Sequence, residues 1–128
     1  MRITTHTLLI AATVATTLAV GQPALALTAD EKREKSRLVA AERATLTRNA
    51  ADVRLAFAKK CEAAFAADEP MPEKDLRIAD PVVIDDDLMG MTSEEISEQF
   101  GIAAAAFDES DKAVNDCLRK YGKRNEGS

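Results

Sequence analysis

The stretch DEKREKSRLVAAERATLTRNAADVRLAFAKKCEAAFAA, from Asp30 to Ala67, decides the fold of this chain. It contains no Gly and no Pro, and it is rich in Ala, the residue with the highest helix propensity. Asp30 can cap its N-terminus, with Thr28 as the alternative, because short polar side chains accept from the first free backbone N–H groups. We therefore expect one long helix over about residues 30–67, with a break near Asn49 as an alternative.

A second helix is predicted over about residues 92–121. The motif TSEE at residues 92–95 matches a capping box, in which a hydroxyl and a carboxylate each accept from a free backbone N–H. Gly122 fits the position after a helix end, where Gly is favoured. The polar and basic tail over residues 122–128 is expected to fray.

Both predicted helices carry apolar residues at the helical period, which is typical of helices that bury one face. The residues expected to pack between them are Val39, Leu46, Val53, Phe57, Phe65, Ile96, Phe100, Phe107, Val114 and Leu118. The pattern predicts an all-α fold: a small helical domain of two long amphipathic helices.

The connection over residues 68–91 is acidic and contains three of the four Pro residues, which forbid a continuous helix there. It also carries apolar residues, including the run Val82-Val83-Ile84. A long connection with apolar residues of its own is expected to pack on the domain rather than to extend into solvent.

The first 26 residues have the parts of a secretory signal peptide: an early positive charge, a short apolar run and a small-x-small site. Ala24 and Ala26 form that site, so cleavage before Leu27 is expected. Residues 27–128 would then be a single helical domain in the periplasm or the extracellular space. The alternative is an uncleaved segment that anchors the chain in a membrane.

Cys61 and Cys117 are the only two Cys residues, and an even pair in an exported chain predicts one disulfide. Each lies near the C-terminal end of its predicted helix, so a simple antiparallel hairpin would separate them. Three solutions remain open. The helices run parallel with the connection returning beside them, the first helix breaks in two, or the bond joins two protomers.

The only His of the chain is His6, inside the predicted signal peptide. The expected mature chain therefore has no imidazole for nucleophilic catalysis or for a zinc or copper site. We expect no enzymatic activity and no cofactor. Residues 68–116 hold 15 acidic and three basic residues, and this charge argues against nucleic acid as a partner.

The loop DDDLMG that begins at Asp85 partly matches a calcium loop. Oxygen ligands are missing at its fifth and twelfth positions, occupied by Met89 and Ile96. Weak binding of a hard cation by Asp85, Asp87 and Glu94 is the lesser alternative to a solvated acidic loop.

A small exported helical chain without catalytic groups is best suited to protein–protein binding, as an adaptor, inhibitor, immunity factor or chaperone-like factor. The partner is another protein or a second copy. The apolar N-terminus, long helix and two widely spaced Cys residues also resemble the inner-membrane spanin subunit of phage lysis cassettes. That resemblance implies a membrane-anchored, coiled-coil structural role. It rests on the arrangement of the elements alone, because the chain has no diagnostic motif of that family.

Intact-mass measurement of the exported product, without and with reductant, tests the predicted processing. We expect a chain that begins at Leu27 and gains two hydrogens on reduction, because one internal disulfide opens. A product that keeps residues 1–26 would contradict cleavage and support the spanin-like anchor. A product of twice the mass would place the bond between chains.

Overall fold

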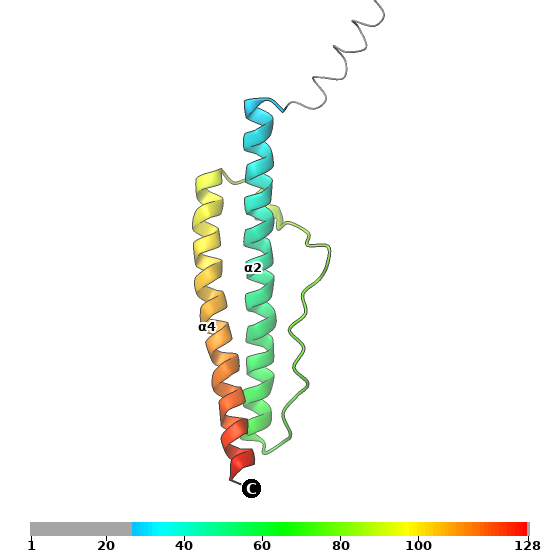
Figure 1. The fold of residues 1–128 in the computed structure, drawn as a ribbon, viewed down its shortest axis with the longest axis vertical. Helices are drawn as coiled ribbons and strands as arrows, with labels where there is room; N and C mark the ends of the chain where they lie inside the picture. The colour runs from blue at the N-terminus through cyan, green and yellow to red at the C-terminus, as the bar shows by residue number, and fades with distance from the viewer. Residues whose placement is uncertain (1–26, 128) are drawn as a thin grey trace, which may run out of the picture. The chain divides into compact units, whose positions relative to one another are not determined.

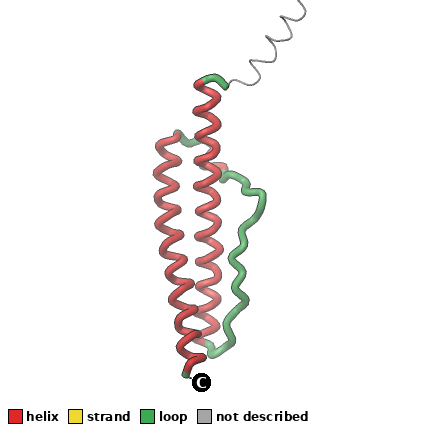
Figure 2. Tube along the Cα trace, viewed as in Figure 1, coloured by secondary structure: helices red, strands yellow, loops and turns green. Residues whose placement is uncertain are grey.

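The computed structural model describes residues 27–127 of the 128-residue chain. The predicted signal peptide, with Ala24 and Ala26, lies outside the described residues. The described part is mostly helical and has no strand (Figure 2). Its elements in chain order are α2 (Ala29–Ala66), the short α3 (Asp86–Met89) and α4 (Ser93–Glu126) (Figure 1).

The chain divides into two compact units, residues 1–35 and residues 36–128. In the first unit, the Thr28 hydroxyl accepts from the backbone N–H of Glu31 at 3.1 Å, and the Glu31 carboxylate accepts from the backbone N–H of Thr28 at 3.4 Å. Thr28 is therefore the cap of α2, as in a capping box. Asp30, the first expectation for the cap, pairs instead with Arg33 at 2.7 Å.

Helix α2 ends in a Schellman motif, which turns the chain back sharply. The backbone N–H of Glu69 donates to the carbonyl of Ala64 at 2.8 Å, and that of Asp68 donates to Phe65 at 3.2 Å. Asp68 adopts the left-handed conformation with a φ of 56°, which Asp tolerates better than most residues other than Gly.

Helix α4 runs parallel to the part of α2 in the same unit, and the connecting segment returns beside α2 (Figure 1). Near the start of α4, the Arg37 guanidinium donates to the carbonyl of Met91 at 3.2 Å. Near its end, a disulfide joins Cys61 to Cys117 with a Cα–Cα distance of 6.2 Å. The chain thus adopts the first of the three topologies, and α2 is unbroken at Asn49.

Two clusters of buried side chains form the core. The disulfide cluster consists of Phe57, Ala58, Cys61, Val114, Cys117 and Tyr121. The Leu88 cluster consists of Ala41, Ala44, Leu88 and Ile96. Each cluster combines residues of α2 and α4, so together they hold the two helices at both ends of their contact.

The residues expected to pack between the helices divide into three groups. Buried are Phe57, Ile96 and Val114; partly buried are Val53, Phe65, Phe100, Phe107 and Leu118. Val39 and Leu46 are 48% and 39% exposed, contrary to the prediction. The reason is that this part of α2 buries a different side, on which small residues such as Ala41 and Ala44 pack with Leu88.

The connecting segment is packed only in part. Leu76 packs against the disulfide cluster, and Ile84 and Met91 pack against the Leu88 cluster. Val83 and Met71 are 80% and 44% exposed. Partly and fully exposed apolar residues therefore alternate along this segment, and Leu76, Ile84 and Met91 attach it to the two clusters.

Helix α4 begins as predicted, with Thr92 and Glu95 forming the capping box. It continues to Glu126, however, so the predicted end at Gly122 and the frayed tail are wrong. The last turns are held from outside the helix, because Arg124 donates to the carbonyl of Glu69 at 3.0 Å. Its guanidinium also lies over the rings of Phe65 and Tyr121, 4.9 and 4.4 Å from their centroids.

Replacing both Cys61 and Cys117 by Ala should lower the free energy of unfolding by about 4 kcal/mol, because the bond closes a loop across 56 residues of sequence. Urea unfolding followed by circular dichroism measures the difference. The unsubstituted chain unfolded in reductant is the control and should lose a similar amount. Equal stability of all three samples would contradict a stabilising disulfide.

Candidate functional site

One guanidinium joins the three helices. Arg48 of α2 donates to the carboxylates of Asp85 at 3.0 Å and Asp87 at 3.1 Å, and to the side-chain oxygen of Gln99 in α4 at 2.9 Å. One turn earlier, the buried Thr45 hydroxyl accepts from the backbone N–H of Asp85 at 3.1 Å. The Arg48 side chain is only 24% exposed, so these contacts are partly shielded from water.

The charges at this junction stabilise one another. The hydrogen bond from Arg48 holds the pKa of Asp87 below its ordinary value of 3.8. The same bond is the largest cause of the raised pKa of Arg48, although partial burial acts against it. Both groups therefore stay charged over the whole physiological range, which suits a structural ion pair and gives no group poised for proton transfer.

The predicted cation ligands have other roles in the fold. Asp85 and Asp87 face the Arg48 guanidinium, while Glu94 lies in the first turn of α4. Within residues 27–127, no group of three or more His, Cys, Asp or Glu residues is placed to hold a metal ion. The positive charge beside the two Asp residues is supplied by the chain itself.

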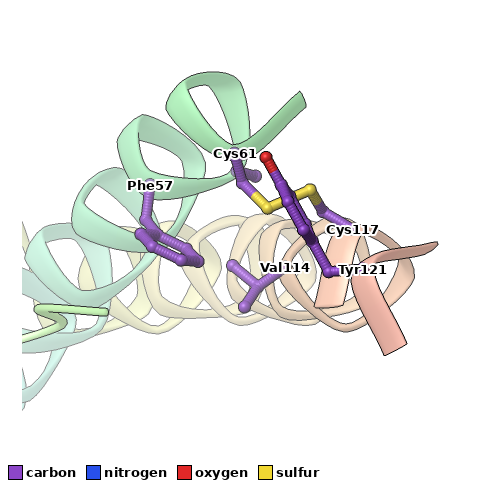
Figure 3. Close-up of a cluster of buried hydrophobic side chains, with 6 residues drawn as sticks. Phe57, Cys61, Val114, Cys117 and Tyr121 are labelled. Atoms are coloured by element: carbon purple, nitrogen blue, oxygen red, sulfur yellow. A yellow bond between two sulfur atoms is a disulfide. The ribbon is translucent and has the colours of Figure 1, made fainter. Parts of the chain in front are cut away.

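The disulfide lies in the interior of its cluster, with the rings of Phe57 and Tyr121 nearby (Figure 3). Both Cys61 and Cys117 are 0% exposed. The Tyr121 hydroxyl donates to the carbonyl of Glu69 at 2.8 Å, which fixes the ring over this end of the helix pair. Buried sulfurs without solvent access are typical of structural bonds rather than of reactive thiols.

A groove runs between the middle parts of α2 and α4 and encloses about 260 Å³. We call it the central groove. Its lining residues are Ala51, Asp52, Leu55, Ala106, Glu109, Ser110 and Ala113. The Ser110 hydroxyl, 4% exposed, already donates to the carbonyl of Phe107 at 2.9 Å. The groove therefore presents small and apolar side chains, with acidic groups on both helices.

A neighbouring concavity toward the end of α4 is lined mainly by charged residues: Glu62, Ala113, Asp116, Arg119, Lys120 and Lys123. Lys120 pairs with Glu62 at 2.8 Å, and Arg119 pairs with Asp116 at 3.1 Å. Four of the five charged side chains that line this concavity are therefore already paired with each other.

The contacts of Arg48 with Asp85, Asp87 and Gln99, and the central groove, were not predicted from the sequence. A signal for Arg48 is its position three residues after Thr45, which puts the two on one side of the helix. Leu55, which lines the groove, lies outside the predicted stripes and is 44% exposed.

Comparison with protein-family models, with curated proteins and with solved structures finds no match to this chain. Among the described helices, none is long and apolar enough to cross a membrane. The surfaces of α2 and α4 are therefore the features from which a function of the described residues is inferred.

The lowered pKa of Asp87 predicts how acid affects stability. The unfolded chain binds a proton at Asp87 more readily than the folded chain, so its contribution is complete above about pH 4 and disappears as the pH falls further. Asp87→Asn should lower stability at about pH 6 and make little difference at about pH 2. Urea unfolding across this pH range measures both values.

The matched control is Asp86→Asn, since the neighbouring Asp86 is also exposed in α3 but makes no hydrogen bond to Arg48. It should keep the pH dependence of the unsubstituted chain. An Asp87→Asn deficit that is equal at both ends of the pH range would contradict the assigned ion pair.

Proposed function

We propose that this chain is an exported, non-enzymatic helical protein that binds a helix of another protein in the central groove. The observation that carries the proposal is the apolar, small-residue floor of that groove between two helices. Ala51 and Ala113 have no side chain beyond Cβ, so a third helix could approach the pair closely. Leu55 would supply a large apolar contact on the α2 side.

The groove extends along α4 beyond its lining residues. Ile102 precedes Ala106 by four residues, so the two side chains share one face of the helix. Ile102 is 58% exposed, so its apolar side chain is available to a partner in the groove. The apolar contact area would then run over two turns of α4.

The charges beside the groove indicate the chemistry of the partner. Asp52 on α2 and Glu109 on α4 are the two charged groups that line it, and both are acidic. A partner helix with one apolar face and Lys or Arg residues beside that face would match this pattern. The enclosed volume, about 260 Å³, lies below the range of about 300–1,000 Å³ that is usual for small-molecule sites.

Ala106→Arg tests the proposal by filling the groove with a long charged side chain. Ala106 is exposed in the free chain, so the fold should not change. The unsubstituted chain, immobilised on beads, should retain a protein from extracts of its own compartment, and Ala106→Arg should weaken that binding by about tenfold or more. Surface plasmon resonance with the purified partner gives the two values of Kd.

Val83→Glu is the matched control, because Val83 is 80% exposed on the connecting segment rather than in the groove. It should bind the partner as the unsubstituted chain does. Recovery of no partner, or a partner that binds Ala106→Arg with unchanged Kd, would contradict binding in the central groove.

A further inference from the structure

The connecting segment between α2 and α3 differs from both long helices in how its backbone is held. Residues 70–84 form no helix (Figure 2), and none of them makes a backbone–backbone hydrogen bond with another described residue. Their peptide groups are therefore available to pair with another chain. The substrate cleft of a protease binds peptide in this way, through backbone hydrogen bonds to an extended strand.

The same segment holds the basic residues that lie outside the helices. Lys74 and Arg77 are both exposed, and every other Lys or Arg among residues 27–127 belongs to α2 or α4. A protease that cuts after Lys or Arg holds that side chain in a pocket with an acidic group at its base. A helix has to unfold locally before its backbone fits such a cleft, whereas no helix has to open at Lys74 or Arg77.

Arg77 is the better placed of the two basic residues. Its side chain is 89% exposed, and its neighbours in sequence are the apolar residues Leu76 and Ile78 rather than the acidic residues that flank Lys74. The Arg77 guanidinium donates to both carboxylate oxygens of Asp75, at 2.9 and 2.8 Å. An ion pair so open to water contributes little, so the acidic group of a protease pocket can replace it.

The chain before the Arg77–Ile78 bond is attached to the helices by contacts that do not need this bond. Leu76 packs against the disulfide cluster. The Glu69 carbonyl accepts from the Tyr121 hydroxyl at 2.8 Å, so the turn after α2 is tied to α4.

The chain after this bond is attached as well. Leu88 is fully buried in its cluster, and Ile84 packs against that cluster. Arg48 of α2 donates to Asp85 at 3.0 Å. The disulfide joins two residues on opposite sides of the bond in sequence, so it links the two parts covalently after a cut.

We propose that the connecting segment is a cleavage site for a protease that cuts after Lys or Arg, with the Arg77–Ile78 bond as its main target. Hydrolysis adds one water molecule across this bond, which leaves a carboxylate on Arg77 and an ammonium group on Ile78. The product is a folded two-chain protein, held together by the disulfide and by the two clusters. It keeps the central groove, because all the residues that line the groove belong to α2 and α4.

Limited digestion with trypsin, on protein produced from the full 128-residue sequence, tests the proposal. Without reductant, the first product should have the mass of the undigested chain plus one water molecule. With reductant, it should separate into two fragments whose masses place the main cut after Arg77. Circular dichroism of the cleaved, unreduced protein should show the helix content of the undigested chain, because α2 and α4 keep their contacts.

A variant with both Lys74→Gln and Arg77→Gln should be digested about tenfold more slowly or less, since every remaining site in the described residues requires a helix to open. The matched control carries Lys59→Gln and Lys60→Gln, which remove two exposed basic residues from α2. It should be cut in the connecting segment at the rate of the unsubstituted chain. All four positions are exposed, so both variants should fold.

Five outcomes would overturn the proposal: a chain that trypsin does not cut, a first cut within α2 or α4, a main cut after Lys74, a Lys74→Gln and Arg77→Gln variant that is digested as fast as the unsubstituted chain, or a cleaved product that loses its helix content before reduction. None of them bears on partner binding in the central groove, which is measured separately with Ala106→Arg.

Discussion

The Cys61–Cys117 disulfide is the constraint on which the rest of the structure depends. It joins two positions that both lie toward the C-terminal ends of their helices, so α2 and α4 run parallel along their contact. Parallel helices need a connection that travels back over their length. The three Pro residues and scattered apolar residues of the segment between them meet this need, since the segment forms no helix before α3 and yet packs on both clusters through Leu76, Ile84 and Met91.

Small residues and one shielded arginine complete the packing. Ala41 and Ala44 let Leu88 of α3 approach α2 closely, and the Arg48 guanidinium then ties α3 and α4 to α2 through charged hydrogen bonds. The same side of the helix thus serves apolar and polar contacts within about two turns. Because α3 and the connecting segment bind on this side, Val39 and Leu46 on another side of α2 stay exposed.

Two exposed apolar regions with different properties follow from this arrangement. The central groove has acidic groups on both of its helices, which suits a basic partner helix. Val39 and Leu46 of α2 leave a second apolar area in solvent.

The sequence was enough to predict the two long helices, the capping box at Thr92 and one disulfide, because these depend on local propensity, on hydrogen bonds between near neighbours and on an even number of Cys residues. It did not determine which topology satisfies the disulfide, how far α4 extends, or which side of α2 is buried near Val39. Only the tertiary structure decided these points. Periodicity shows that a helix has an apolar side, but small Ala residues can be buried as readily as larger ones, and only the neighbouring elements determine which side they cover.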